Sequence, residues 1–404
     1  MGTDLDNIFS NFEKNQVFED KSLLQENHTP KEILHRDEQI NQIASILAPL
    51  LRGDKPSNLF LYGKTGTGKT LSIKFLTKEI ISRLKKTDFE LRIEYLNCKL
   101  KKVADTEYRI LAELIRKLGG EIPATGLPTE TVYSRFIDLI DGKKQLIVLI
   151  FDEIDQAVKK ISDDFLYNLT RLNSELSKAR ITLIGISNDL TFLDNLDPRV
   201  RSSLSEEELV FPPYNALQIQ DILKQRADKS FKTGVLDDGV IAKCAALAAR
   251  EHGDARRALD LLRIAGELCE RENSNRIGLK YLDMANEKIE RDKILDVIKT
   301  EPKQFQLVLL SIIKLAEKLK SNNSKESIFT GDVYNFYQSL CREYKSDVLT
   351  QRRVSDIIQE FDMLGIINVR VISKGRGGRM REIKLVISDK IIKKSKDIII
   401  ESLL

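Results

Sequence analysis

The sequence predicts an α/β domain, in which a parallel sheet is covered by helices on both faces, followed by a helical segment and a smaller domain of helices and a hairpin. Three observations predict this order. A glycine-rich loop lies between a strand pattern and a helix pattern near residue 65, apolar strands then alternate with amphipathic helices as far as residue 211, and residues 302–404 contain helix patterns followed by two short strands. Ligands of such parallel sheets bind at the carboxyl ends of the strands.

Length and composition indicate a folded protein of two or three domains. The chain has 404 residues, of which 42% are hydrophobic and 31% charged. No apolar run is long enough to cross a bilayer, and the first residues lack the pattern of a signal peptide. We therefore expect a cytoplasmic protein without a membrane partner. Its four cysteines and three histidines are scattered, which indicates neither a disulfide framework nor a zinc site.

Charge is distributed unevenly along the chain, although the net charge is only +4. Residues 302–404 contain 19 Lys and Arg against 12 Asp and Glu, whereas the part before them contains 46 against 49. A basic surplus at one end fits nucleic acid or another anionic partner, and by itself it fits a solvated face equally well.

The N-terminal part contains an expected arm, residues 1–20, and then the α/β domain, residues 21–211. An amphipathic helix pattern at residues 33–51 leads towards the glycine-rich loop. His35 and Arg36 near its start fit two interpretations, solvent-exposed helix residues or contacts to a nucleotide.

The glycine-rich loop matches the phosphate-binding pattern Gly-x-x-x-x-Gly-Lys-Ser/Thr at every fixed position. Glycines let successive N–H groups point at phosphate oxygens, Lys69 reaches the outer phosphates, and the Thr70 hydroxyl can bind magnesium. A strand at residues 59–62 and a helix after the loop provide the context that the motif requires. The loop therefore predicts a site for ATP or ADP with Mg²⁺. Its residues are Gly63, Lys64, Thr65, Gly66, Thr67, Gly68, Lys69 and Thr70.

Two further apolar strands carry polar residues at their carboxyl ends. The run at 146–151 ends at Asp152 and Glu153, and the run at 181–186 precedes Asn188. We expect Asp152 to hold the magnesium ion, Glu153 to orient and deprotonate the attacking water, and Asn188 to fix that water or a phosphate oxygen. A strand at 91–97 and helices at 106–118 and 129–140 are expected earlier in the domain.

Arg199 and Arg201 follow the last strand that the sequence indicates in this domain. In a ring or filament of subunits, an arginine at this place reaches the neighbour's nucleotide and stabilises the charge that develops in phosphoryl transfer. A surface ion pair is the equal alternative for both arginines.

Residues 212–298 are expected to form a helical lid after a double-proline hinge. Arg256 and Arg257 occupy the first turn of a helix, where cations oppose the helix dipole, so an anionic partner is expected. We expect Arg256 to fold over the phosphates, with Tyr214 and Arg226 beside the base and ribose. Arg257 fits a solvated position equally well.

Residues 302–404 are expected to form a winged helix. Helices at 304–319 and 330–345 precede a third helix, which Thr350 caps and Gly365 ends. Its outward face is typical of a recognition helix, and we expect Arg352 and Gln359 to contact DNA. The buried stripe of this helix is expected to contain Val354, Ile357, Ile358, Phe361 and Leu364, which turns Gln351, Arg352, Ser355 and Gln359 outward.

A basic hairpin completes the expected winged helix. Strands at 366–372 and 382–387 flank a glycine-rich tip, and residues 366–379 contain four basic residues ahead of a single acid, Glu382. This charge pattern favours contact with DNA over a solvated turn. The basic residues are Arg370, Lys374, Arg376 and Arg379.

In combination, these motifs resemble an AAA+ ATPase: the phosphate loop, Asp152-Glu153, Asn188, the arginine segment and Gly-Asp-Ala-Arg from residue 253. The resemblance is narrowed by His-Arg-Asp-Glu-Gln-Ile from residue 35, Phe-Pro-Pro-Tyr from residue 211, and a helical insert at 106–126. From about residue 20 onward, the chain resembles archaeal replication initiators, the family related to the large subunit of the eukaryotic origin recognition complex and to its helicase-loading partner.

The resemblance implies a magnesium-ATP switch that hydrolyses ATP slowly, binds double-stranded origin DNA in the nucleoid and helps recruit the replicative helicase. Other initiator subunits on the DNA are further implied partners. It also implies origin contacts from the insert, carried here by Lys101, Lys102 and Arg109. Relatives vary in which arginine the arginine segment contains, so the choice between Arg199 and Arg201 stays open.

Two other functions share some of these motifs. A winged-helix transcription regulator could use ATP only as a conformational signal, but the complete set of Asp152, Glu153 and Asn188, together with the insert, favours an initiator. Genome-wide mapping of bound DNA separates the two, because an initiator concentrates at a few replication start sites and a regulator at many promoters. A clamp-loader subunit is disfavoured, because that machine has no need for a basic winged helix.

Overall fold

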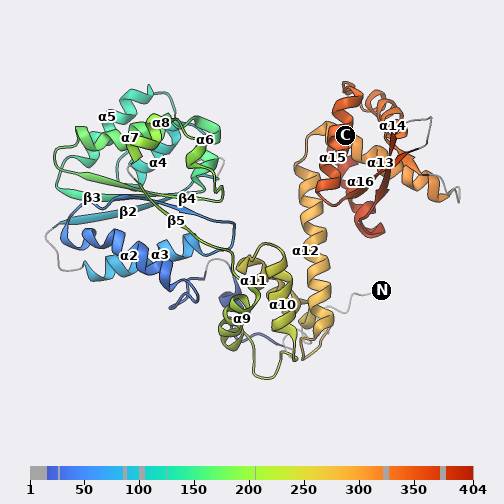
Figure 1. Cartoon of the computed structure of the whole chain (residues 1–404), viewed down its shortest axis with the longest axis horizontal. Helices are drawn as coiled ribbons and strands as arrows, with labels where there is room; N and C mark the ends of the chain where they lie inside the picture. The colour runs from blue at the N-terminus through green and yellow to red at the C-terminus, as the bar shows by residue number, and fades with distance from the viewer. Residues whose placement is uncertain are drawn as a thin grey trace, which may run out of the picture. The chain divides into compact units, whose positions relative to one another are not determined.

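The computed structural model describes residues 16–25, 28–84, 89–99, 105–123, 125–204, 206–321, 327–373 and 379–403. The chain divides into two compact units, Met1–Leu282 and Asp283–Leu404 (Figure 1). The first unit contains an α/β base and a lid of helices, and the second contains the C-terminal domain. None of the helices in the described ranges has the length and apolar character needed to cross a bilayer.

The base is built on a five-stranded sheet in which all neighbouring strands are parallel, as the sequence predicts. The strands lie in the order β2-β3-β4-β1-β5, so β3 and β4 are neighbours and their carboxyl ends meet at one edge. β5 lies outside the sequence prediction, which ends with β4. The strands are β1 (Asn58–Tyr62), β2 (Glu90–Asn97), β3 (Gln145–Asp152), β4 (Arg180–Ser187) and β5 (Glu206–Val210).

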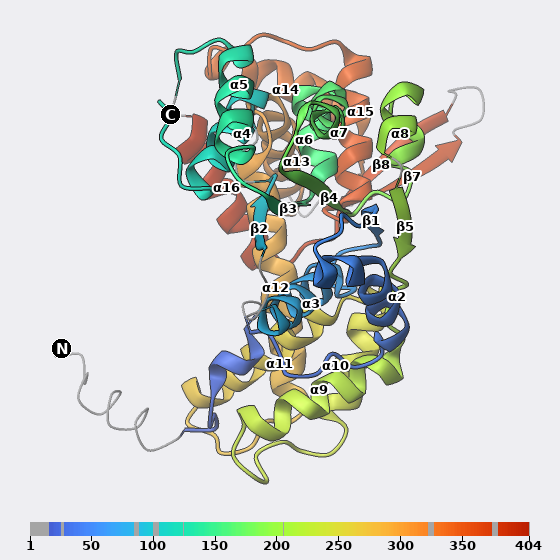
Figure 2. The ribbon, with the colours of Figure 1, turned by 90° about the vertical axis from the view of Figure 1, so that its left-hand side faces the viewer.

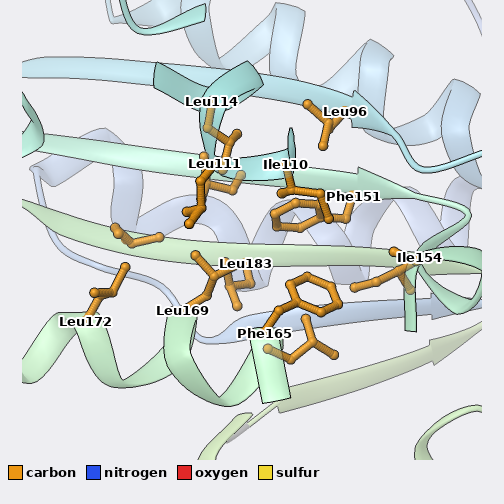
Figure 3. Close-up of a cluster of buried hydrophobic side chains, with 14 of the residues drawn as sticks. Leu96, Ile110, Leu111, Leu114, Phe151, Ile154, Phe165, Leu169, Leu172 and Leu183 are labelled. Carbon is orange, nitrogen blue, oxygen red and sulfur yellow. The ribbon is translucent and has the colours of Figure 1, made fainter. Parts of the chain in front are cut away.

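Helices cover both faces of this sheet (Figure 1). Successive side chains of a strand point to opposite faces, and β1 shows the result, since Leu59 and Leu61 join one buried cluster while Phe60 and Tyr62 join the other. In the second cluster, side chains of α4 and α7 pack against Phe151 and Leu183 of the sheet (Figure 3). The first face carries α2 (Asp37–Leu47) and α3 (Lys69–Arg83), and the second carries α4 (Glu107–Lys117), α5 (Thr129–Ile140), α6 (Ile154–Ile161), α7 (Asp164–Glu175) and α8 (Pro198–Leu204).

The lid consists of α9 (Ala216–Ser230), α10 (Val240–Arg250) and α11 (Ala255–Arg271). A capping box of Asn215 and Gln218 starts α9. Asp254 caps α11, because its carboxylate accepts from the N–H groups of Arg256 and Arg257. The first turns of α9 and α11 are therefore both stabilised by side-chain caps.

Residues 16–25, here called the N-terminal segment, pack on the lid helices (Figure 2). The Val17 N–H donates to the buried Glu270 carboxylate at 3.0 Å, and the ring of Phe18 stacks on Phe231 with centroids 4.9 Å apart. We expected residues 21–211 to form the base, yet the short helix η1 (Lys21–Leu24) contacts α9 and α11. The lid is therefore assembled from two parts of the chain, and the domain boundaries remain proposals.

In the residues that the structure describes, the second unit contains a small antiparallel sheet, in the order β6-β8-β7, four helices and most of α12. Val354, Ile357, Ile358 and Phe361 of α15 are buried as predicted, but Leu364 is 43% exposed because the helix has already ended. The Thr350 hydroxyl caps α15, also as predicted. The elements are α12 (Leu279–Thr300), α13 (Lys303–Ser321), β6 (Ile328–Phe329), α14 (Thr330–Glu343), α15 (Gln351–Met363), β7 (Ile367–Ser373), β8 (Arg379–Leu385) and α16 (Asp389–Leu403).

Candidate nucleotide-binding site

The glycine-rich loop joins β1 to α3 and needs glycine at its turning points. Gly66 and Gly68 have φ angles of +70° and +94°, which other residues rarely adopt. A Cβ atom on Gly66 would lie 1.7 Å from Oδ1 of Asp254, so the lid approaches the loop as closely as a glycine permits. The Ala255 N–H of the lid also donates to the Gly66 carbonyl at 3.3 Å. Loop and lid are therefore in direct contact.

Lys69 is buried at the start of α3 and points back into the loop. Its ammonium donates to the carbonyl oxygens of Gly63 and Lys64 at 2.6 and 2.8 Å, and to Oδ1 of Asn188 at 3.0 Å. Burial lowers the pKa of Lys69 to about 8, Asp152 opposes this change and Arg256 adds to it. These contacts bring together the loop and the tip of β4, and with them two of the residues that the sequence assigns to the nucleotide site.

Asp152 ends β3 with a buried carboxylate whose oxygens both accept hydrogen bonds. Oδ2 accepts from the hydroxyl of Thr70 at 2.9 Å and from that of Tyr95 at 2.5 Å, and Oδ1 accepts from the Glu153 N–H at 3.0 Å. The pairing of Thr70 with Asp152 places one hydroxyl and one carboxylate together, and Mg²⁺ prefers such oxygen ligands. Sequence reasoning missed Tyr95, which lies on the neighbouring strand β2.

Glu153 occupies the turn between β3 and α6 with φ of +55°, a conformation that is uncommon for residues other than glycine. Its carboxylate lies 3.8 Å from the ammonium of the exposed Lys99. Strained backbone of this kind is often found at functional sites. It places Glu153 beside Asp152 on the wall of the same cavity.

Arg36, which sequence reasoning left undecided, lies buried next to the glycine-rich loop. Only 2% of Arg36 is exposed, so the exposed-helix interpretation is wrong. Its guanidinium donates to the carbonyl oxygens of Thr67 at 2.8 Å and Pro212 at 2.6 Å, and lies 3.7 Å from the ring centroid of Tyr214. Arg36 thus contacts the glycine-rich loop and the lid hinge rather than pointing into solvent, and His35 contacts Asp221 of the lid at 3.1 Å.

The lid supplies the arginines of the site. Tyr214, Arg226 and Arg256, which the sequence assigns to nucleotide contacts, all line the cavity, and burial lowers the pKa of Arg226. Arg257 points elsewhere and pairs with Glu251 at 3.3 Å, with only 11% of its side chain exposed, so the solvated alternative for Arg257 is wrong.

One cavity of about 560 Å³ connects these residues. Its volume lies in the range of small-molecule and cofactor sites. The loop, the strand tips and the lid line this cavity together with residues near the N-terminus. His28 and Ile33 belong to the N-terminal group, and Gln225 lies on α9 of the lid. The donor set fits a nucleotide with Mg²⁺, because cationic and N–H groups suit phosphates and the Thr70–Asp152 pair suits the metal. Within the described part of the chain, no group of three or more acidic, His or Cys side chains is arranged so that it could hold a metal ion by itself.

Arg199 and Arg201 lie on α8, and neither lines the cavity. The side chain of Arg199 is 80% exposed and pairs with Asp197 two residues earlier. Arg201 is tied to Asp194 at 3.0 Å and Glu208 at 3.9 Å. Arg199 is therefore the more exposed of the two arginines.

The predicted DNA-contacting residues are spread over both units. Arg352 and Gln359 are exposed on α15, and Arg109 of α4 forms an ion pair with Asp105 at 3.1 Å. Lys101, Lys102, Lys374 and Arg376 lie outside the described residues, as does the side chain of Arg379.

Three protein-family profiles match consecutive parts of the chain. The profile described as "AAA domain" matches residues 52–192, "Cdc6 AAA+ ATPase-type lid domain" matches residues 220–287, and "CDC6, C terminal winged helix domain" matches residues 296–395.

Several curated relatives, all named ORC1-type DNA replication protein, match nearly the whole chain. The ORC1-type DNA replication protein of Thermococcus onnurineus is 52% identical over 386 residues, which are 94% of this chain and 91% of the relative. The protein of that name from Pyrococcus furiosus is 50% identical over 386 residues, which are 94% of this chain and 90% of the relative.

Solved structures give the same picture. The Aeropyrum pernix ORC1 protein, solved in complex with DNA, is 40% identical, with a TM-score of 0.80 and coverage of 96% of this chain and 99% of that chain. Cdc6p from Pyrobaculum aerophilum covers 96% of this chain and 100% of that chain at 23% identity and a TM-score of 0.59, a similarity of fold alone.

Proposed function

This chain belongs to the family of ORC1-type DNA replication proteins, with an AAA+ ATPase domain, a lid and a winged helix, and on this premise we propose that it is an ATP-dependent replication initiator. It binds double-stranded origin DNA sequence-specifically and helps recruit the replicative helicase. The membership confirms the resemblance that the motifs indicate.

The observation that carries this proposal is the convergence of five polar side chains on one cavity. Lys69, Thr70, Asp152, Glu153 and Asn188 come from the loop, α3 and the ends of β3 and β4, and all line that cavity together with Arg256 of the lid. Such a set can neutralise phosphate charge, hold a divalent cation and activate water at one place.

Each residue has a distinct task in this proposal. Lys69 neutralises the outer phosphates, and Thr70 and Asp152 hold Mg²⁺, which lowers the charge repulsion at the phosphates when bound. Glu153 accepts a proton from the attacking water, and Asn188 orients that water or a phosphate oxygen. Hydrolysis then changes the charge next to Arg256, and this change shifts the conformational equilibrium of the lid.

An arginine from a neighbouring subunit would complete the site, and we assign this task to Arg199. Its side chain is 80% exposed, whereas that of Arg201 is 47% exposed and pairs with both Asp194 and Glu208. Arg199 is therefore the more accessible of the two arginines to a neighbouring subunit.

The winged helix supplies the DNA contacts in this proposal. Arg352 and Gln359 project from the exposed face of α15 and can reach base edges in a major groove, while Lys374, Arg376 and Arg379 contact phosphates or the minor groove. Lys101, Lys102 and Arg109 of the insert add a second contact region. The solved complex of the Aeropyrum pernix ORC1 protein with DNA supports DNA as the partner.

The nucleotide half of the proposal is tested by a pair of substitutions. We expect Lys69→Ala to abolish ATP binding, because the phosphate charge is then no longer neutralised. Glu153→Gln should leave binding intact and reduce hydrolysis by 10²-fold or more, roughly the contribution of a general base. Nucleotide affinity and phosphate release are measured for both variants and for the unchanged protein.

The outcomes separate the two roles. Equal loss of ATP binding in both variants would show that Glu153 is not the base, and unchanged binding in Lys69→Ala would remove the nucleotide site itself. Thermal melting serves as the control that both variants are folded.

A further inference from the structure

Among the described residues that contact the Asp152 carboxylate, Tyr95 is the one to which the proposed reaction assigns no role. It lies on β2, opposite Ile150 of β3, so its side chain stands beside the end of the strand that carries Asp152. Its hydroxyl donates to Oδ2 of Asp152 at 2.5 Å, and the same oxygen accepts from Thr70 at 2.9 Å. Tyr95 also lines the cavity.

The ring of Tyr95 is held in place from its other side. The ammonium of Lys74 lies 4.6 Å from the ring centroid, within the range of a cation–π contact. Lys74 follows Thr70 by one turn of α3 and lines the cavity as well. The phenol is therefore fixed between the helix that carries Thr70 and the strand tip that carries Asp152.

We propose that Tyr95 is a positioning residue for the magnesium site, whose hydroxyl fixes the Asp152 carboxylate in the orientation that binds the metal. The inference rests on the proposed Mg²⁺-ATP site. The hydroxyl of a phenol is a hydrogen-bond donor. With the Glu153 N–H on Oδ1 and Tyr95 on Oδ2, the carboxylate has a donor on each oxygen and cannot rotate without breaking one of them.

A donor to a metal-binding carboxylate acts on the metal rather than on the phosphates. Residues that hydrogen-bond metal ligands typically contribute 10- to 100-fold in metal affinity or activity. Since Lys69 and the loop N–H groups provide the phosphate contacts, loss of the Tyr95 hydroxyl should change the Mg²⁺ requirement and leave Mg²⁺-free nucleotide affinity nearly unchanged.

The chain offers a matched control for this test. Tyr133 donates its hydroxyl to Oε1 of Glu107 at 2.5 Å, so it makes the same phenol–carboxylate hydrogen bond within the same domain. Burial raises the pKa of Tyr133 as it does that of Tyr95, with the partner carboxylate adding to both shifts. Tyr133 does not line the nucleotide cavity. Tyr133→Phe therefore removes an equivalent bond away from the site.

The experiment compares the full-length protein with Tyr95→Phe and Tyr133→Phe. Binding of a fluorescent ATP analogue is titrated in EDTA and at a series of Mg²⁺ concentrations, and Mn²⁺ bound in the presence of ADP is counted by electron paramagnetic resonance. We expect Tyr95→Phe to need roughly 10- to 100-fold more Mg²⁺ for half-maximal effect. Its affinity for the analogue in EDTA should stay within about twofold of the unchanged protein, and Tyr133→Phe should match the unchanged protein in both measurements.

Three results would overturn the assignment of Tyr95. The Mg²⁺ titration of Tyr95→Phe could coincide with that of the unchanged protein, which leaves the nucleotide site intact but removes the role of Tyr95. Affinity in EDTA could fall as much as affinity in Mg²⁺, which would make the phenol part of the cavity wall only. If the unchanged protein bound the analogue without any response to Mg²⁺, the proposed metal site and the role of Tyr95 would fall together.

Discussion

The guanidinium of Arg36 donates to carbonyl oxygens on two segments that lie far apart in the sequence, Thr67 in the glycine-rich loop and Pro212 in the lid hinge. Burial lowers the pKa of Arg36, and the stacked Tyr214 opposes this change. A buried acceptor that loses its donor costs about 1–3 kcal/mol. Arg36 therefore stabilises the loop and the hinge with one side chain.

We predict that Arg36→Met destabilises the protein by about 2–4 kcal/mol and weakens nucleotide binding, since two carbonyl oxygens lose a donor while the buried volume is partly kept. Unfolding in urea and titration with a fluorescent nucleotide measure the two effects. Arg92→Met is the control, because Arg92 also donates to a backbone carbonyl, that of Leu118, but is one-third exposed and lies away from the cavity. Comparable losses in both variants would argue against a special role for Arg36.

Single site residues can be predicted from the sequence when their partners are close in the chain or when they belong to a known motif. Lys69 and Thr70 follow from the loop pattern, and Asp152 and Asn188 follow from the ends of apolar strands. Arg36 and Tyr95 escape such reasoning for physical reasons. The acceptors of Arg36 are backbone carbonyls that no residue type encodes, and the contact of Tyr95 depends on the register between β2 and β3.

Among the larger elements, the glycine-rich loop and the start of α11 fit together without space between them. The Thr65 hydroxyl lies 3.3 Å from Oδ2 of Asp254, and a Cβ on Gly66 would overlap the same carboxylate. Asp254 also caps α11, so any movement of Asp254 moves the first turn of that helix, which carries Arg256.

We predict that Gly66→Ala lowers nucleotide affinity at least tenfold, because the added methyl group displaces Asp254 and with it Arg256. Gly234→Ala is the control, since Gly234 has a similar φ of +79° with nothing within 4 Å of the added atom. Both substitutions pay the left-handed backbone cost of about 1–2 kcal/mol, but only Gly66→Ala has the clash. The same loss of affinity in both variants would attribute the effect to backbone strain alone.

The elements of the fold were predictable to the extent that their hydrophobic pattern is local. The four strands β1 to β4 and helices such as α3, α5 and α15 follow from runs and periodic stripes. β5 was missed because its sequence, Glu206 to Val210, is mostly acidic and forms a strand only by pairing with β1 at the edge of the sheet. β6 was also missed, because it has two residues and forms a strand only by pairing with β8. α16 has a periodic apolar face that packs on α13, and the sequence interpretation left this pattern unused.

For the molecule as a whole, the nucleotide site and the proposed DNA-reading helix lie in different units. Arg256 belongs to the first unit and Arg352 to the second. A nucleotide can bias DNA binding only if ATP and ADP differ in their affinity for two conformations of the protein. Arg256 lines the cavity from the lid and acts on the pKa of Lys69, which makes it the candidate for sensing that difference.

We predict that Arg256→Ala leaves a folded protein whose affinity for origin DNA no longer differs between ADP and ATP. Affinities for an origin duplex and a scrambled duplex are measured with each nucleotide at fixed salt, because salt alone changes DNA affinity strongly. Arg257→Ala serves as the comparison, since Arg257 occupies the same helix turn but pairs with Glu251 outside the cavity. If Arg256→Ala kept the difference between nucleotides, another residue would be the sensor.

The docking of the N-terminal segment on the lid also sets an order of events at the ribosome. Val17 bonds to Glu270, which is 253 residues later in the chain. At about 5–20 residues per second, synthesis takes roughly 10–50 s to supply this partner. During that interval Val17 and Phe18, which are apolar, lack the surface that covers them in the finished protein. The lid can therefore complete its fold only after the whole α/β base has been synthesised. The nucleotide cavity thus forms late in the translation of each chain.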